Sequence, residues 1–311
     1  MHTFHTSGGL ILRESAVHPD SWFREEDLDL DLAIYKYLAR MGEEHTGYPA
    51  ISIFDEFTFE DDRPFRRGCA TSFFYEHFGA FVFSIELWDW ENELGIGHFR
   101  ERGGVEFSFD KLSEDDQLKE LHWIDSNYPE AFTQWIPFHH PQLGEVEIGG
   151  IDTKISRRNP PPGEFLVKEA DKVLPFALRH VALFPLLRIT ETRITKVSEG
   201  VYKVLAYVVN TGWLPTYVTQ IAKRIKRAYL VTAEIKLPDE AELVTGHERV
   251  DLGHLDGQSA KLLLPRVVGD EVVDKTRASV EWVVKTSTPV EVTLVARCPR
   301  AGTHRVVVRL E

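Results

Sequence analysis

The sequence changes both its hydrophobic pattern and its charge near residue 187. Residues 1–187 hold 17 basic and 34 acidic side chains, a net charge of −17, and alternate strand-like with helix-like segments. Residues 188–311 hold 19 basic and 15 acidic side chains, a net charge of +4, and consist of short strand-like runs. Because the two patterns bury their apolar residues in different ways, we predict two domains, 1–187 and 188–311.

The first domain has the strand and helix rhythm of an α/β layer. The apolar run 80–85 follows a glycine and is typical of a strand buried on both faces. We predict strands at 10–12 and 80–85, and helices at 25–43, 73–79, 115–126 and 164–184. The Pro- and Gly-rich stretch 159–163 breaks the chain before the last of these helices, and glycines around 139–150 indicate a hairpin or an ordered loop.

The second domain reads as an all-β, immunoglobulin-like sandwich. Its runs are rich in β-branched residues and are separated by Gly and Pro. Several short strands at this spacing are typical of two packed antiparallel sheets. We predict strands at 188–195, 201–209, 229–237, 261–264, 279–284, 290–296 and 304–310.

Composition excludes several classes of protein. The chain has 311 residues and two cysteines, too few for a disulfide framework or a Cys-rich zinc module. It has no apolar run of the ~18 residues that span a bilayer, so we expect a soluble protein. Its net charge of −13 disfavours nucleic acid as a partner. The basic cluster 223–227 lacks interleaved aromatic residues and is interpreted as a solvated edge.

Two segments contain residue types suited to chemistry. His5 precedes the short apolar strand 10–12, and Glu86 ends the apolar run that begins at Phe81. A buried carboxylate is costly unless it is paired, coordinated or placed at a cleft, and ligands of α/β sheets bind at strand ends. From the pattern alone, a structural role for Glu86 has about equal weight.

These two segments, in this order, resemble the C-terminal half of zinc carboxypeptidases of the M14 (carboxypeptidase A-like) family. His5 followed by Leu10-Ile11-Leu12 is similar to the family's third zinc ligand and its strand. Phe83-Ser84-Ile85-Glu86-Leu87 is similar to the F-x-x-E-L strand end that carries the catalytic glutamate, and residues 68–79 resemble the segment that enters it. The resemblance covers residues 1–187 and implies a partial mixed sheet with helices, in which 164–184 is the C-terminal helix.

The resemblance implies a zinc-dependent metallocarboxypeptidase that releases C-terminal residues from peptides or proteins. In that family a catalytic zinc has three protein ligands and an open position for water. His5 is then a zinc ligand, and Glu86 is the general base that takes the proton of the attacking water. Thr71 and Ser72 fall at the floor of the substrate pocket, where many family members have an Asp.

The departures from the family pattern indicate a fragment. The H-x-x-E motif and the arginines of the family precede its third ligand, and only four residues precede His5. His98-Phe99-Arg100-Glu101 follows Glu86, in the wrong order, and Phe59 takes the place of a mobile tyrosine. We therefore expect an N-terminally truncated chain that is inactive alone, with the remaining zinc ligands in the missing part. The alternative is a non-catalytic scaffold, in which a degenerate peptidase remnant accompanies a sandwich that binds a partner.

Other candidate residues carry weaker hypotheses. His2 is the main competitor of His5 as a ligand, but its spacing from the strand 10–12 does not match the motif. His139 and His140 are adjacent and so point in different directions, which favours a structural or surface role. Cys69 lacks an indicated partner, and we interpret it as a buried structural cysteine.

Overall fold

The computed structural model describes residues 1–57, 68–101, 112–263 and 275–311. Phe59 lies outside the described residues. The chain forms two compact units. The first comprises Met1–Trp22, Tyr35–Phe73 and Val82–Leu178, and the second comprises Phe23–Ile34, Phe74–Phe81 and Arg179–Glu311. Across the described ranges, no helix has both the length and the apolarity needed to cross a membrane.

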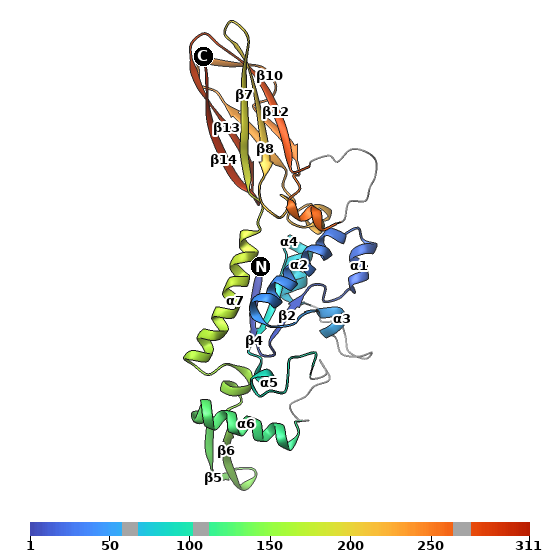
Figure 1. Cartoon of the computed structure of the whole chain (residues 1–311), viewed down its shortest axis with the longest axis vertical. Helices are drawn as coiled ribbons and strands as arrows, with labels where there is room; N and C mark the ends of the chain where they lie inside the picture. Colours follow the sequence, from blue (N-terminus) through green and yellow to red (C-terminus); the bar gives the residue numbers. More distant parts are fainter. Residues whose placement is uncertain (58–67, 102–111, 264–274) are drawn as a thin grey trace. The chain divides into compact units, whose positions relative to one another are not determined.

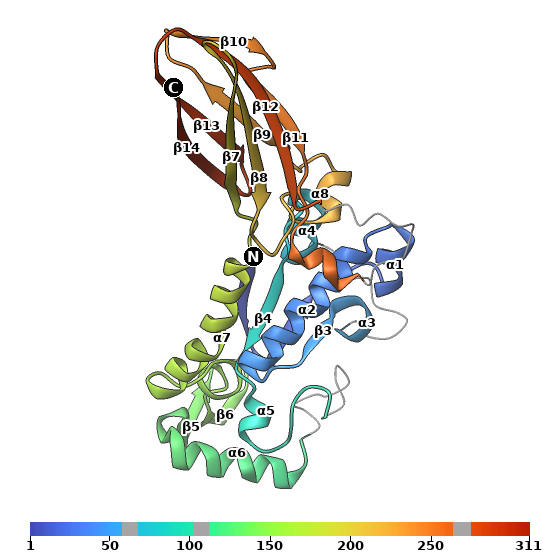
Figure 2. The same cartoon turned by 45° about the horizontal axis from the view of Figure 1, so that its top comes forward.

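A four-stranded mixed sheet organises the first unit (Figures 1 and 2). Its strands are β1 (His2–Thr6), β2 (Leu10–Arg13), β3 (Ala50–Ser52) and β4 (Phe83–Leu87), in the order β1-β4-β2-β3. β1 runs parallel to β4 and β2 runs parallel to β3, whereas β2 is antiparallel to β4. Neither β1 nor β3 was predicted, because neither shows a distinct hydrophobic alternation.

The helices before residue 187 are α1 (Asp20–Glu25), α2 (Asp29–Thr46), α3 (Ile53–Phe57), α4 (Ala70–Phe78), α5 (Trp90–Glu93), α6 (Glu114–Asn127) and α7 (Glu164–Ala182). Helices α2 and α7 pack against one face of this sheet. Phe176 of α7 and Tyr35 of α2 both contact the ring of Phe83 on β4, with centroids 5.6 Å away in each case. A Cβ at Gly42 of α2 would lie 2.7 Å from Ile11 Cδ1. Glycine at this position therefore allows α2 to approach β2 closely.

The helix predicted over 25–43 is divided in the structure. α1 ends at Glu25 and α2 begins at Asp29, because Asp27 adopts a positive φ of 55° that no continuous helix allows. The predicted helices at 115–126 and 164–184 correspond to α6 and α7, and Pro175 lies inside α7.

A hairpin follows α6 and the short 3₁₀ turn Pro129–Ala131. Its strands are β5 (Phe132–His140) and β6 (Gly144–Ile151), which pair only with each other among the described strands. A single turn of π-helix, Lys154–Arg158, then leads toward α7. The hairpin begins earlier in the sequence than the glycines around 139–150 indicated.

The side chain of Ser113 caps the start of helix α6. The Ser113 Oγ accepts a hydrogen bond from the Asp116 N–H at 3.1 Å and satisfies one of the free amides at the helix start. We expect Ser113→Ala to lower the free energy of unfolding by about 1 kcal/mol, measured by urea denaturation. Ser126→Ala, an exposed position in the last turn of the same helix, is the control. Equal losses for the two variants would contradict the capping role.

The second unit contains a β-sandwich (Figure 1). One antiparallel sheet has the order β10-β12-β8-β7 and the other has the order β11-β9-β13-β14. The first comprises β7 (Leu187–Ser198), β8 (Val201–Asn210), β10 (Ala241–Thr245) and β12 (Arg277–Thr286), and the second comprises β9 (Val231–Lys236), β11 (Arg249–Gly253), β13 (Val290–Cys298) and β14 (Gly302–Leu310). Alternate residues of each sheet form one shared core, which includes Val204, Trp282 and Leu294.

Two departures from the predicted strands occur in this unit. The apolar run 261–264 was predicted as a strand, but Gln258–Leu262 forms a 3₁₀ helix, since a short apolar run does not by itself distinguish the two structures. β10 and β11 were not predicted because both are polar edge strands. The short helix α8 (Gln220–Arg224) carries part of the basic cluster 223–227.

Candidate active site

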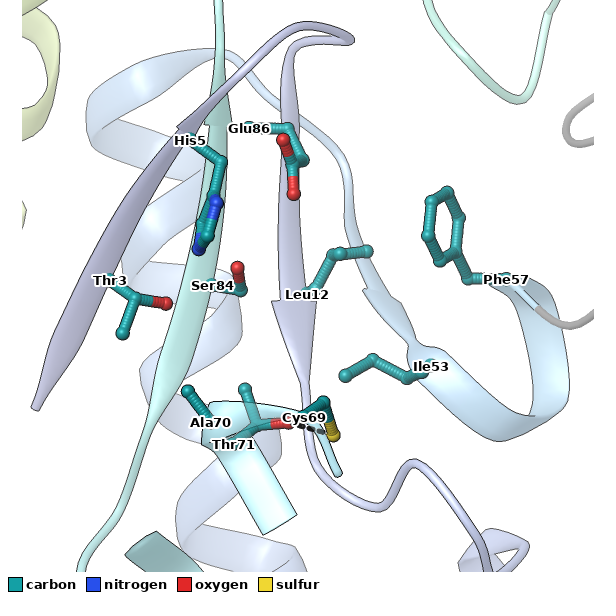
Figure 3. Close-up of a pocket in the computed structure, with 10 residues that line it drawn as sticks. All are labelled: Thr3, His5, Leu12, Ile53, Phe57, Cys69, Ala70, Thr71, Ser84 and Glu86. Carbon is teal, nitrogen blue, oxygen red and sulfur yellow. Dashed lines mark hydrogen bonds between the residues drawn. The ribbon is translucent and has the colours of Figure 1, made fainter. Parts of the chain in front are cut away.

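The side chains of His5 and Glu86 lie on neighbouring strands at the same level of the sheet (Figure 3). In the parallel pair β1–β4, His5 is the register partner of Glu86, and Thr3 is the register partner of Ser84. Since side chains of a strand alternate between faces, these four side chains share the face opposite Phe83 and the covering helices. The fold thus brings together two residues that are distant in the sequence.

A cavity of about 270 Å³ opens beside this pair. It is lined by Thr3, His5, Leu12, Ile53, Phe57, Cys69, Ala70, Thr71, Ser84 and Glu86. Figure 3 shows His5 and Glu86 at one end, Leu12 and Ile53 along the wall, and Cys69 and Thr71 at the other end. His5 is exposed and Glu86 is half-buried, so solvent reaches the pair, whereas Leu12, Ile53, Thr71 and Ser84 are buried.

The start of helix α4 forms the end of the cavity away from Glu86. Thr71, which is 2% exposed, contacts it, and its Oγ1 lies 3.2 Å from Cys69 Sγ. Ser72 does not line the cavity, and its hydroxyl donates to Glu14 Oε1 at 2.6 Å. Cys69 is half-buried and faces the cavity, whereas we had predicted a buried structural cysteine.

Backbone contacts at Trp88 hold the ends of β1 and β4 together. The Trp88 N–H donates to Glu169 Oε2 at 3.0 Å and to Tyr48 Oη at 3.1 Å, and the Trp88 carbonyl accepts from the Gly8 N–H at 3.0 Å. Trp88 adopts a positive φ of 70°, a costly conformation for a residue with a side chain. These contacts secure the loop after His5 to the turn after Glu86.

The support at Trp88 depends on a buried carboxylate. Glu169 of α7 is 2% exposed, and it accepts hydrogen bonds from the Tyr48 hydroxyl and from Lys172 Nζ. Burial and the neighbouring Glu169 charge raise the pKa of Tyr48 well above its usual range. Tyr48 therefore remains a donor at every physiological pH.

His2, the alternative to His5 as a zinc ligand, does not line the cavity. His2 is on the opposite face of β1 and contacts the rings of Phe176 and Phe83 at centroid distances of 4.5 and 5.9 Å. Burial, together with the positive charge of the chain's amino terminus, lowers the pKa of His2 to about 4. His2 is therefore neutral at pH 7, but it does not face the cavity.

The other histidine motifs are held by carboxylates outside the cavity. His98 Nδ1 lies 2.5 Å from Asp89 Oδ2, and the His98 N–H donates to Glu101 Oε2 at 2.9 Å. His139 and His140 end β5 as adjacent strand residues, and His139 Nδ1 lies 2.6 Å from Glu145 Oε1 on β6. None of these residues lines the cavity.

A complete zinc site is not present among the described residues. Within the ranges that the structure describes, no group of three or more His, Cys, Asp or Glu side chains is arranged to hold a metal ion. A catalytic zinc requires three protein ligands. His5 supplies one imidazole, so the described part of the chain does not by itself fit the cofactor that the resemblance implies.

Sequence reasoning did not single out several cavity residues. Thr3 and Ser84 precede His5 and Glu86 by two positions, and the strand period of two would have placed all four on one face. Ile53 and Phe57 gave no comparable signal, because α3 reaches the cavity only through tertiary packing.

Comparisons with known proteins do not assign a function to this site. Residues 186–309 match a protein family described as a domain of unknown function (DUF8731). No curated protein matches the chain. Among solved structures, the chain is similar to the GAE domain of GGA2p from Saccharomyces cerevisiae, at 12% identity over 40% of this chain and 90% of that chain. The TM-score of 0.22 is too low to support an inference about fold or function.

Proposed function

We propose that residues 1–187 are part of an M14-like zinc-carboxypeptidase domain, that Glu86 is its general base, and that His5 is one of its metal ligands. The observation that carries this proposal is the in-register pairing of His5 and Glu86 beside one cavity. An imidazole and a carboxylate side by side at a solvent-accessible cavity are suited to binding a metal ion and to accepting a proton from water. We also propose that the sheet of the first unit is a partial carboxypeptidase sheet and that the sandwich is immunoglobulin-like.

The described residues supply one zinc ligand, and this incomplete set defines the expected behaviour of the 311-residue chain. One imidazole binds zinc far more weakly than a three-ligand site. We propose that the remaining ligands come from outside these 311 residues and that the chain alone has no peptidase activity. Glu86 would then accept the proton of the attacking water only in a complex or a longer chain that supplies those ligands.

The test compares the 311-residue chain with a chain that begins upstream of Met1 in the same reading frame. We expect the longer chain to retain stoichiometric zinc and to release C-terminal amino acids from peptides, and the 311-residue chain to do neither. Peptides with an amidated C-terminus are the control, since a carboxypeptidase requires the free carboxylate. A zinc-loaded longer chain without hydrolysis would refute the proposal and favour the non-catalytic scaffold. Zinc retention and hydrolysis by the 311-residue chain would refute the ligand assignment.

The lining of the cavity indicates the class of substrate. Apart from His5 and Glu86, its lining consists of apolar and hydroxyl side chains and one thiol. A charged side chain that extends past His5 and Glu86 into the rest of the cavity would meet no opposite charge there, which costs free energy. We therefore propose that the site accepts an uncharged C-terminal residue.

Substrate preference can be measured on peptides that differ only at the last residue. We expect kcat/KM of the active form to be about 100-fold higher for C-terminal Leu than for C-terminal Lys or Glu, equivalent to about 2.7 kcal/mol. Equal rates, or a preference for Lys or Glu, would show that this cavity does not hold the C-terminal side chain.

A further inference from the structure

Strand β1 forms one edge of the four-stranded sheet. Among the strands that the structure describes, β1 pairs only with β4. The Phe83 N–H donates to the Met1 carbonyl at 3.0 Å, and β1 runs parallel to β4. Because alternate residues of a strand bond to the same neighbour, the backbone groups of Thr3 and His5 are directed toward β4. The backbone N–H and C=O of Phe4 therefore point away from β4, toward the open edge.

An apolar groove of about 460 Å³ lies next to this edge. The sheet contributes Phe4 and Leu87 to its lining, and α7 contributes Leu166 and Val173. Phe4 and Leu166 are 50% and 54% exposed, so two large apolar side chains of the groove are half open to solvent. A ligand that buries them removes apolar surface from water, which is favourable.

The polar side chains of the groove already have hydrogen-bond partners within the protein. Thr6 Oγ1 donates to Asn159 Oδ1 at 3.2 Å, and Asn159 Nδ2 donates to the Lys154 carbonyl at 2.8 Å. The third, Glu169, is the buried carboxylate that holds Trp88 in place. A ligand therefore meets apolar side chains in the groove and open backbone groups on the strand edge.

These two features together specify an extended peptide. Backbone groups at a sheet edge are satisfied by an added strand, whose side chains alternate between the two faces of the sheet. Side chains on the face of Phe4 would enter the groove, and those on the other face would lie beside Thr3 and His5 (Figure 3). A helix could fill the groove, but it has no free backbone groups along its length to pair with the edge.

A second copy of this chain fits the edge less well than a peptide of different charge. Residues 1–187 carry a net charge of −17, so pairing two copies through β1 would bring two strongly acidic regions together. A neutral or basic peptide does not meet this repulsion. Charge therefore favours a peptide over self-association.

We propose that the open edge of β1 and the adjoining groove form a binding site for an extended, neutral or basic peptide with apolar side chains at alternate positions. The peptide adds a strand to the sheet, and Phe4 supplies both a backbone donor and a backbone acceptor to it. Binding requires neither zinc nor hydrolysis, so the site does not depend on the proposed peptidase function.

Isothermal titration calorimetry of the 311-residue protein tests the proposal. The probe is the peptide Lys-Val-Thr-Val-Thr-Val-Lys with an acetylated N-terminus and an amidated C-terminus, and we expect saturable binding. The same peptide with N-methyl groups on its three central amides keeps the charge and the side chains but loses donors to the strand edge. We expect its Kd to be at least about 10-fold higher.

Two pairs of variants locate the site. Phe4→Pro removes the outward N–H without removing a hydrogen bond to β4, and we expect it to raise the Kd about 30-fold, whereas Phe4→Leu should keep the Kd within about 5-fold. Leu166→Ser removes an apolar contact from the groove and should raise the Kd about 10-fold. Leu178→Ser is its control, since Leu178 is 61% exposed on α7 and does not line the groove.

Three results would overturn the proposal: no saturable binding to the wild type up to ~1 mM peptide, equal binding of the N-methylated peptide, or equal losses in Leu166→Ser and Leu178→Ser. These comparisons decide the proposal even if Phe4→Pro does not fold. Sedimentation velocity of the free protein tests the other occupant. A dimer that Phe4→Pro dissociates, while Phe4→Leu does not, would assign the edge to a second copy and overturn the peptide site.

Discussion

Glu86→Gln is expected to lower the turnover of the zinc-loaded longer chain by about 10²- to 10⁴-fold, because glutamine keeps the size of the side chain but cannot take a proton. Glu86 is half-buried on β4, the second strand of its sheet, and its register partners are His5 on β1 and Leu10 on β2. An isosteric replacement leaves these contacts and the cavity in place. We therefore expect KM, zinc content and the midpoint of thermal unfolding to change little. Steady-state release of C-terminal amino acids provides the measurement.

Ser84→Ala is the matched control for this experiment. Ser84 lies on the same strand and faces the same cavity as Glu86, two residues earlier, and its replacement removes a polar group without removing a base. We expect Ser84→Ala to retain turnover within about 10-fold of the wild type. If Glu86→Gln retains turnover to the same extent, the assignment of Glu86 as general base is wrong, even if the chain proves to be a peptidase.

Trp88→Ala is expected to lower the free energy of unfolding of the first unit by about 3–5 kcal/mol. Trp88 is 1% exposed, and its ring lies 5.8–6.1 Å from the rings of Trp90, Trp123 and Phe165. Its Nε1 also donates to the Ser156 carbonyl at 2.6 Å. Truncation removes aromatic contacts, opens a cavity and leaves a buried carbonyl without its donor, and these losses act in the same direction.

Urea denaturation followed by circular dichroism and by tryptophan fluorescence measures this loss, and two probes reveal whether the units unfold separately. Trp135→Ala is the control, since Trp135 is 57% exposed on the β5–β6 hairpin. We expect it to cost less than about 1 kcal/mol. Equal effects of the two substitutions would show that the aromatic cluster around Trp88 does not stabilise the unit.

Local patterns predicted the regular elements best. β8 alternates buried and partly exposed residues along its whole length, and α7 is an amphipathic helix that follows a proline-rich break. Both patterns reflect contacts within one element and its immediate partner. β1, with the sequence His-Thr-Phe-His-Thr, has no such pattern and is a strand because it pairs with β4. A strand that forms only by pairing with a distant segment cannot be predicted from the hydrophobic periodicity of its own sequence.

In the candidate site too, the sequence identified the residues and only the tertiary structure placed them together. The residue types of His5 and Glu86, and the family resemblance, identified both as candidates, but only the register of β1 and β4 makes them neighbours. Thr71 and Ser72 are adjacent in the sequence, yet one faces the cavity and the other donates to Glu14. Successive helical positions point about 100° apart, so the direction of each side chain depends on what the helix packs against.

The sequence by itself determined the α/β and all-β composition of the two regions and the residue types available for acid–base chemistry. Tertiary structure decided which face of the sheet carries the cavity and which buried carboxylate holds three helices together. The sequence does not distinguish Asp31 from the other acidic residues of the run 25–31, and its partners Tyr75 and Gln220 lie 44 and 189 residues away. The energy of a buried charge depends on the groups that surround it, and those groups are brought together only by folding.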